Sequence, residues 1–396
     1  MHITGIVAEY NPFHNGHVYH LEATKAMGAT HLVAVMSGNF VQRAEPAIVS
    51  KFDRARIAAS LGVDLVIELP LAYASAVSER FAFGAVSLLN ALGVVDSMSF
   101  GSESGDISLL MQTSEALEDA RVIRRIRQLT EVGENYPSAQ EKALEVFYPE
   151  LSHIVAGPNN ILALDYIKAL RKTGSSIEPL TVPRRGAGHD DIDIDLSYNI
   201  ASASRIRDII SQRGYFGSLV PHECELAMLD AIVAGRISGS FERIESAVLY
   251  KLRGLSKEQF SELPEASTGL GDRLYNAVQT ASSIEELYEL TKTRRYTMSR
   301  VRRAVLMAFM DISVKDYTSI PYIRLLAIGP NGGDILKAMK KKCSLAVSGS
   351  PLELIELRGI AADTIRKEAR ATDIYNLTLG KRGPTGEEYT TRLYTY

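Results

Sequence analysis

Short apolar strands alternate with helix-forming segments in the first part of this chain, and this alternation constrains the fold more than any other feature. Four strand-like runs, each ended by polar or turn residues, are expected at residues 3–8, 31–36, 65–69 and 97–100. Helical patterns lie between them, as at residues 50–61, where Ser50 and Asp53 have capping-box spacing and Gly62 follows as the stop. Strands joined by helices need crossover connections, so we predict a doubly wound α/β fold with a mainly parallel sheet.

The alternation does not continue through the whole chain. Residues 105–175 have helical patterns that include a basic stretch, and residues 178–182 form a strand-like run that we expect to rejoin the sheet. Beyond residue 215 few strands are expected. We therefore predict two domains, an α/β domain over residues 1–214 and a mostly α-helical domain over residues 215–396. The basic stretch comprises Arg121, Arg124, Arg125 and Arg127.

Composition excludes several classes of protein. Lys and Arg total 44 against 47 Asp and Glu, a formal net charge of −3, so a uniformly basic nucleic-acid coat is excluded and a local basic face is not. No apolar run approaches the roughly 20 residues that cross a bilayer, and no secretory signal is expected at the N-terminus. Cys224 and Cys343 are too few for a disulfide framework and too far apart for a paired zinc motif. We expect a cytoplasmic protein without membrane partners.

The strongest local motif directly follows the first expected strand. It reads Asn11-Pro12-Phe13-His14-Asn15-Gly16-His17. Ligands of open α/β sheets bind beyond the carboxyl ends of strands, often at a helix N-terminus. Gly16 has no Cβ and lets the backbone approach a phosphate, while His14 and His17 share one side of the first helical turn. Imidazoles placed in this way stabilise charge that develops on an α-phosphate, so the motif indicates nucleotidyl transfer.

Two other interpretations of these histidines stay open from the sequence. The spacing of His14, His17 and His20 is compatible with a metal site, although no cysteine or acidic ligand accompanies it. The three residues also fit ordinary surface histidines, because a motif match is by itself a hypothesis. The position after a strand favours the nucleotide-binding interpretation over both.

A second element with phosphate-binding chemistry lies far along the chain at residues 202–207, before an apolar helix. Ser202 and Ser204 can donate hydrogen bonds to phosphate oxygens from a helix start, and Arg207 can hold the β- and γ-phosphates. Alone, this segment is equally well an ordinary helix N-cap. Paired with the histidine motif, it predicts a nucleotide site built from two distant parts of the chain.

The two motifs together resemble the HxGH and SSTxIR signatures of the nucleotidyltransferase superfamily, to which the HIGH motif of class I tRNA synthetases is related. More closely, the run from Gly5 to His17 resembles the bacterial tRNA(Met) cytidine acetate ligases. Further matches are dense in the first 210 residues and looser in the helical half. They lie at residues 36–43, 64–70, 100–103, 157–162, 269–274 and 294–297. The resemblance implies an N-terminal Rossmann-like nucleotidyltransferase domain with a parallel sheet, followed by the helical domain.

The resemblance also implies a two-step reaction. Acetate attacks the α-phosphorus of ATP to give acetyl-adenylate and pyrophosphate. The N4 amine of the wobble cytidine of elongator tRNA(Met) then takes the acetyl group, which gives N4-acetylcytidine and AMP. Because acetate is already ionised near neutrality it needs no general base, and His14 and His17 are expected to catalyse by positioning and charge stabilisation. Mg²⁺ is expected as a cofactor on the phosphates, where it needs few protein ligands.

In that family the segment from Val7 to His20 lines the ATP site, completed by a glycine, an asparagine and a pair of arginines. The ATP-binding residues implied here are Val7, Ala8, Glu9, Tyr10, Asn11, Pro12, Phe13, His14, Asn15, Gly16, His17, His20, Gly101, Asn160, Arg184, Arg185, Ser202, Ser204 and Arg207. This chain departs from the family at two places. A tyrosine-histidine-aspartate run is replaced by residues 188–191, which include His189, and Ala44 stands where a glycine is common.

Two cationic clusters in the second half are candidates for tRNA contact. Cations neutralise backbone phosphates, and an aromatic ring can stack on an unpaired loop base. The cluster expected to bind tRNA comprises Arg294, Arg295, Tyr296, Arg300, Arg302 and Arg303. The second cluster comprises Lys337, Lys340, Lys341 and Lys342. A solvated helix face is the alternative interpretation of each.

Two other functions stay open from the sequence. One is an HxGH nucleotidyltransferase that adenylylates a small phosphorylated metabolite, which leaves the long helical half unexplained. The other is a non-catalytic RNA-binding protein that has kept a nucleotide fold, which leaves the intact set of His14, Gly16, His17 and Arg207 unexplained.

Overall fold

The computed structural model describes residues 1–184, 199–264, 266 and 269–396. Within these residues a central sheet has eight strands in the order β5-β4-β1-β2-β3-β6-β7, with β8 beside β6. The strands are β1 (Ile3–Ala8), β2 (His31–Ser37), β3 (Leu65–Leu69), β4 (Ser97–Ser102), β5 (Glu178–Pro183), β6 (Ile323–Ile328), β7 (Val347–Ser348) and β8 (Tyr394–Thr395).

The first five strands run parallel to one another, which confirms the predicted α/β fold. Their carboxyl ends therefore lie along one edge of the sheet. Side chains alternate between the two faces, so that Val33 of β2 belongs to the core on one face and Leu32 to the core on the other. Helices cover both faces, which explains why these strands are almost continuously apolar.

The helix expected at residues 50–61 forms against the sheet at Lys51–Ser60. Ser50 caps α2 by accepting a 3.1 Å hydrogen bond from the main-chain nitrogen of Asp53. Gly93 ends α4 in the left-handed conformation, with φ of 68°. The helices packed around the sheet are α1 (Asn15–Ala26), α2 (Lys51–Ser60), α3 (Leu71–Ala74), α4 (Ser78–Leu92), α8 (Pro158–Lys172), α9 (Ala203–Ser211) and α10 (His222–Val233), with the 3-10 helix η2 (Gly217–Leu219) before α10.

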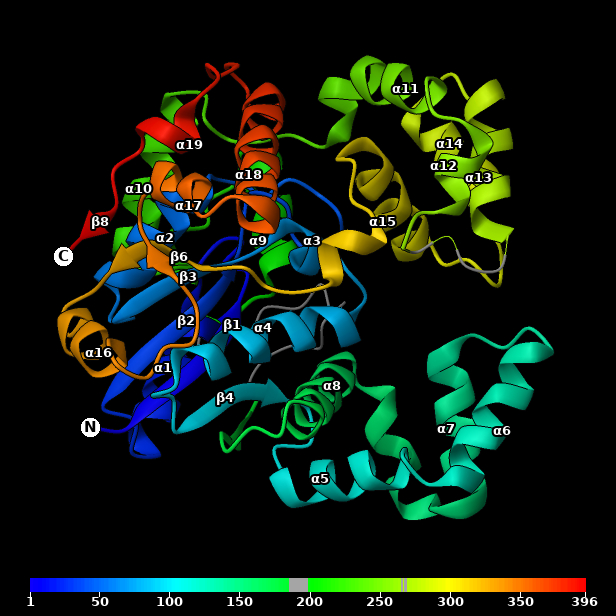
Figure 1. Ribbon diagram of the computed structural model, residues 1–396, viewed down its shortest axis with the longest axis horizontal. Coiled ribbons are helices and arrows are strands. Elements are labelled where there is room, and N and C mark those ends of the chain that lie inside the picture. The colour runs from blue at the N-terminus through cyan, green and yellow to red at the C-terminus, as the bar shows by residue number, and fades with distance from the viewer. Residues whose placement is uncertain (185–198, 265, 267–268) are drawn as a thin grey trace.

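Two groups of helices extend from the same side of the sheet, one at the lower right and one at the upper right of Figure 1. The first, called here the α5–α7 arm, comprises α5 (Ile107–Ala116), α6 (Ala120–Glu131), α7 (Tyr136–Phe147) and η1 (Pro149–Ala156). The second, called the α11–α15 arm, comprises η3 (Phe241–Ile244), α11 (Glu245–Arg253), α12 (Lys257–Ser261), α13 (Leu270–Thr280), α14 (Ile284–Thr291) and α15 (Met298–Phe309). Phe40 and Leu71 join the core of the second arm to the strand ends.

The chain returns to the sheet after the α11–α15 arm, which the sequence pattern did not predict. β6 pairs antiparallel with β3, and β7 and β8 pair with β6. Gly329 and Gly332 allow this approach, because a Cβ at either position would collide with the backbone of Val63 and Asp64. The last elements are η5 (Val314–Tyr317), α16 (Gly332–Met339), α17 (Pro351–Glu356), α18 (Gly359–Thr378) and α19 (Glu387–Thr390).

The expected boundary near residue 214 stays a prediction. Packing is continuous across it, since Ile206 and Ile210 of α9 share one core with Cys224 and Met228 of α10. Among the described helices, none has both the length and the apolar character required to cross a membrane.

Candidate active site

A cavity of about 290 Å³ lies at the carboxyl ends of β1, β4 and β5, next to the first turns of α1 and α9. This volume is close to the lower bound of about 300–1,000 Å³ that small-molecule sites occupy. Most of the residues predicted to bind ATP line it. These are Val7, Ala8, Glu9, Tyr10, Asn11, His14, Gly16, His17, His20, Gly101, Arg184, Ser202, Ser204 and Arg207.

Four predicted ATP-binding residues do not line the cavity and have structural roles instead. Pro12 and Phe13 are buried beneath the loop. Asn15 donates hydrogen bonds to the main-chain oxygens of Asn199 and Ser218, at 3.0 and 2.9 Å. Asn160 is 4% exposed and donates to the main-chain oxygen of Ile154 at 3.0 Å, which holds η1 against α8. Arg185 and His189 lie outside the described residues.

The imidazoles of His14 and His17 stack on each other with ring centroids 3.8 Å apart. The main-chain N–H of His14 donates to Nδ1 of His17 at 3.1 Å. Nδ1 of His17 is therefore an acceptor, and the proton of the neutral ring lies on Nε2. Sequence spacing predicted that the two rings share one side of the helical turn. It did not predict that one ring would be oriented by the backbone of the other residue.

Both rings are neutral at physiological pH. Burial, together with the positive charges of Arg184 and Arg207, lowers the pKa of His14 to about 3. Burial and the neighbouring His14 hold the pKa of His17 well below its usual value. The site therefore offers hydrogen-bond donors beside fixed guanidinium charges. Its positive potential comes from the arginines.

Gly16 is required by the packing of the motif itself. A Cβ at Gly16 would lie 2.9 Å from Cε1 and 3.0 Å from Nδ1 of the His14 ring. Any larger residue at this position would push that ring out of its stack with His17. The structure thus adds a reason for the glycine to the close phosphate approach expected from the sequence.

His20 is held by a hydroxyl chain below the cavity. Its Nε2 lies 2.9 Å from Oγ of Ser99, which lies 2.7 Å from Oγ1 of Thr24. With His17 bonded to the backbone and His20 to a serine, the histidines are engaged as hydrogen-bonding groups. Within the described part of the chain, no three histidine, cysteine or acidic side chains are arranged to hold a metal ion, which argues against the metal-site interpretation.

Arg207 joins the two motifs physically. Its Nη1 donates to the main-chain oxygen of Asn11 at 2.7 Å, and its Nη2 donates to Oγ of Ser204 at 3.2 Å. Ser202 caps α9 by accepting from the main-chain nitrogen of Arg205 at 3.1 Å. The helix N-terminus and one guanidinium therefore face the same cavity as the histidines.

Arg184 closes the opposite wall. Its Nη1 donates to Oδ1 of Asn159 at 2.8 Å, and its aliphatic stem packs on Gly101, where a Cβ would lie 3.3 Å from Cγ of the arginine. Burial lowers the pKa of Arg184, and its charge acts on all three histidines of the motif. Arg184 is thus a fixed cation of the cavity, as Arg207 is.

Sequence reasoning missed Arg54, which organises the loops that follow β1 and β2. This fully buried guanidinium donates to the main-chain oxygens of Glu9 at 2.6 Å, Ser37 at 3.1 Å and Gly38. It is buried in the middle of a helix and belongs to no motif, so no local pattern distinguishes it.

Residues 41–45 form another wall that the site prediction omitted. Their sequence signals were the family resemblance at residues 36–43 and the departure from the family at Ala44. Oε1 of Glu9 accepts from the main-chain nitrogen of Gln42 at 2.9 Å, which ties this segment to β1. Ala44 adopts φ of 59°, the left-handed region that favours glycine. The lining residues that the prediction did not name are Ile6, Tyr19, Leu21, Val41, Gln42, Arg43, Glu45, Phe81, Phe100, Asn159, Leu162, Tyr166, Val182, Pro183, Ile200, Ala201 and Ala203.

The predicted tRNA-binding cluster is divided by the structure. Arg294 and Arg295 are exposed at the turn between α14 and α15. Tyr296 is only 7% exposed and packs in the core of the α11–α15 arm, so the expected stacking on an unpaired base is wrong for this conformation. Arg302 forms an ion pair with Glu45 of the cavity wall, which connects this arm to the site. Arg300 and Arg303 are half-buried on α15.

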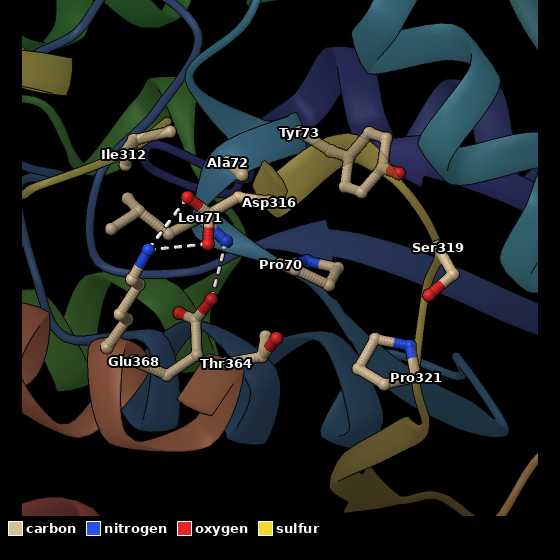
Figure 2. Close-up of a pocket in the computed structure, with 11 residues that line it drawn as sticks. Pro70, Leu71, Ala72, Tyr73, Ile312, Asp316, Ser319, Pro321, Thr364 and Glu368 are labelled. Carbon is tan, nitrogen blue, oxygen red and sulfur yellow. Dashed lines mark hydrogen bonds and ion pairs between the residues drawn. The ribbon is translucent and has the colours of Figure 1, made fainter. Parts of the chain in front are cut away.

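A second hollow lies between α3, η5 and the start of α18, as Figure 2 shows. Its volume of about 20 Å³ holds little more than one water molecule. Glu368 accepts from the main-chain nitrogen of Leu71 at 2.6 Å there, and Lys367 pairs with Asp316 at 2.6 Å. This hollow is too small for a substrate and has structural hydrogen bonds.

Comparison with known proteins gives consistent matches. A family model described as HIGH Nucleotidyl Transferase matches residues 1–388. A protein from Thermoanaerobacter sp. (strain X514) named tRNA(Met) cytidine acetate ligase is 36% identical over 399 residues, covering 98% of this chain and 98% of its own. A protein of the same name from Acetivibrio thermocellus is 37% identical over 398 residues, covering 95% of this chain and 94% of its own.

Two solved structures have the same fold. The apo crystal structure of Thermotoga maritima TmcAL superposes with a TM-score of 0.92 at 30% identity, covering 100% of this chain and 99% of the other. A crystal structure of Thermotoga maritima TmcAL bound with alpha-thio ATP superposes with a TM-score of 0.90 at 29% identity, covering all of both chains.

Proposed function

This chain belongs to the HIGH nucleotidyl transferases and, within them, to the family of the tRNA(Met) cytidine acetate ligases, and from this premise we propose that it acetylates tRNA(Met) at the expense of ATP. Acetate is activated as acetyl-adenylate, and the acetyl group passes to the N4 amine of the wobble cytidine of the elongator tRNA. The proposal includes a cytoplasmic location, where ATP and tRNA are both present.

One observation carries the proposal. The hydrogen bond from Arg207 to Asn11 brings the 202–207 segment and the histidine motif to a single cavity, where Arg184 forms the facing wall. A triphosphate needs several donors and at least two cationic groups at one place, and this cavity supplies the two arginines, the helix N-terminus of α9 and Nε2 of His17.

In the first step a carboxylate oxygen of acetate forms a bond to the α-phosphorus, and the bond from this phosphorus to the bridging oxygen of pyrophosphate breaks. Nε2–H of His17 donates to the phosphate oxygens that gain charge, while Arg184 and Arg207 stay cationic throughout. Such preorganised donors typically contribute 10²–10³ in rate each. The negative charge of the polyphosphate raises the pKa of the neighbouring imidazoles when it binds.

In the second step the N4 amine of cytidine attacks the acetyl carbon, AMP leaves with the phosphate oxygen, and the amine loses one proton. The adenylate supplies the leaving group, so amide formation needs no further activation. The Arg302–Glu45 ion pair lies on the α11–α15 side of the cavity, which supports entry of the tRNA from that side.

Mg²⁺ is part of the proposal as a cofactor of ATP. Glu9 and Glu45 are the carboxylates among the described lining residues, and both already have protein partners. A cavity with so few free acidic ligands fits a cation that is held mainly by phosphate oxygens and water. When bound, the cation would neutralise part of the negative charge of the phosphates.

The test is acetate-dependent exchange of labelled pyrophosphate into ATP, followed by transfer of labelled acetate to elongator tRNA(Met). We expect exchange with acetate alone and label in tRNA only when all three substrates are present. Exchange that needs a phosphorylated metabolite instead of acetate would indicate the metabolite-adenylylating alternative. Absence of any exchange would indicate the non-catalytic one.

A further inference from the structure

The basic stretch of the sequence forms one exposed face of α6 that the catalytic cavity does not use. Val122 and Ile126 turn inward and are 0% and 6% exposed, while Arg124, Arg125 and Arg127 are exposed. Among the residues that the structure describes, these three arginines have no hydrogen-bond or ion-pair partner. Three guanidinium groups without counter-ions repel one another, so this face is suited to binding something anionic.

Nearby acidic side chains do not neutralise the face. Asp119 is held by Arg121 at 2.7 Å and by the hydroxyl of Tyr148 at 2.8 Å. Glu134 is bound by Lys142 at 2.6 Å. Glu131 is the exposed acid at the end of the helix itself. The three arginines of the exposed α6 face are thus not paired with Asp119 or Glu134.

The turn that follows α6 lies near an exposed arginine of the other arm. Figure 1 shows the α5–α7 and α11–α15 arms on the same side of the sheet, with the tip of one approaching the other. The pKa of Glu134 is lowered chiefly by the hydrogen bond from Lys142 and also by the charge of Arg294. An electrostatic effect of this kind requires that the α6–α7 turn and the α14–α15 turn are close in space.

We infer that Arg124, Arg125 and Arg127 of α6, together with Arg294 and Arg295, form a single RNA-binding surface that holds the phosphate backbone of a tRNA stem between the two arms. The inference rests on the proposed function, which requires an RNA substrate near the cavity. Arginine suits this role because its planar guanidinium binds phosphate oxygens in pairs. A chain with a net charge of −3 binds RNA only through such local faces.

The lysine cluster provides a matched control. α16 lies at the far side of the sheet from both arms (Figure 1), and Lys340, Lys341 and Lys342 are exposed just after it. The variant with Arg124→Gln, Arg125→Gln and Arg127→Gln removes three positive charges from the proposed surface. The variant with Lys340→Gln, Lys341→Gln and Lys342→Gln removes the same charge from the opposite side.

The experiment measures the dissociation constant of an elongator tRNA(Met) transcript against salt concentration for both variants and the unaltered protein. We expect the arginine variant to bind at least tenfold more weakly at about 0.1 M salt. We also expect the slope of log K against log salt concentration to be smaller in magnitude by about 2–3, because each lost phosphate contact reduces the slope by roughly 0.7–0.9. We expect the lysine variant to match the unaltered protein. Thermal unfolding of all three proteins shows that α6 has remained folded.

Equal affinity and equal slope for the arginine variant would overturn the inference, and would leave an acidic protein segment as the partner of α6. An equal loss in both variants would also overturn it, since the effect would then be one of net charge. Pyrophosphate exchange by the unaltered protein tests the proposed function separately, so its failure is distinguishable from failure of the RNA-binding surface.

Discussion

Arg207 donates a 2.7 Å hydrogen bond from Nη1 to the main-chain oxygen of Asn11, across a sequence separation of 196 residues. The bond fixes the guanidinium at the edge of the histidine motif and leaves its remaining N–H groups for a ligand and for Ser204. Two segments that lie far apart in the chain thereby become one site.

Arg207→Lys retains the positive charge and removes the fork that reaches Asn11, Ser204 and a phosphate at once. Because a hydrogen bond to a charged group contributes about 1.5–3 kcal/mol, we expect the KM for ATP in pyrophosphate exchange to rise about 10- to 100-fold. Arg205→Lys is the control, since Arg205 lies in the same helix and outside the cavity lining. A KM that stays unchanged in Arg207→Lys would remove Arg207 from the ATP site.

The hydrogen bond from the backbone of His14 to Nδ1 of His17 assigns the useful proton to Nε2. Glutamine can place an N–H near the Nε2 position, whereas asparagine can replace only the Nδ1 acceptor. We therefore expect His17→Asn to lower the rate of adenylate formation by 10² or more and His17→Gln to retain a larger part of it. The rates are measured by acetate-dependent exchange, with His31→Asn as a control far from the cavity. Equal rates for the two variants would contradict the assignment.

Protein stability is expected to depend on pH through the buried imidazoles. In the unfolded chain a histidine has a pKa of about 6.5, whereas burial and the charge of Arg184 lower the pKa of His20 to about 4. Below pH 6.5 the unfolded chain takes up a proton that the folded protein does not, so the free energy of unfolding falls as pH falls through this window, by up to about 1.4 kcal/mol per pH unit for each such group.

Urea unfolding of the ligand-free protein at pH 7.5, 6.5 and 5.5 measures this dependence. His20→Gln removes one titrating group and keeps a polar side chain beside Ser99. We expect its unfolding free energy to change less steeply with pH than that of the unaltered protein. Parallel curves for the two proteins would show that His20 titrates normally.

Arg358 precedes α18 with φ of 58° and ψ of −176°, a conformation that is nearly restricted to glycine. A glycine at this position removes the strain energy of the folded backbone but costs more conformational entropy on folding. The strain energy is the larger of the two by about 1 kcal/mol. Arg358→Gly is therefore expected to raise the free energy of unfolding by this amount. Arg366→Gly, inside the same helix and also exposed, should lower it by about the same amount. A destabilised Arg358→Gly variant would contradict the expectation.

Local patterns in the sequence determined much of the framework. The strands of the parallel sheet and the starts of α2 and α9 follow from signals only a few residues long. Each of these two helices is capped by a serine that accepts from the residue three positions later, at Ser50 and Ser202. Such bonds form between near neighbours, so the order of residues suffices to predict them.

The sequence predicted part of the chemistry of the site. His14, His17, Arg184 and Arg207 were expected at one cavity and line it. The sequence left open which ring nitrogen carries a proton and whether the imidazoles are charged, because burial and the surrounding arginines decide both.

The remaining features come from contacts between residues far apart in the chain. β6 joins β3 because two glycines admit the backbone of a distant loop, Arg54 is surrounded by carbonyls from two strand ends, and Tyr296 is buried by the packing of its own arm. No periodicity encodes such contacts. The sequence by itself determined the elements and the reactive side chains, and the tertiary structure decided their burial, protonation and partners, since these depend on which surfaces meet when the chain is packed.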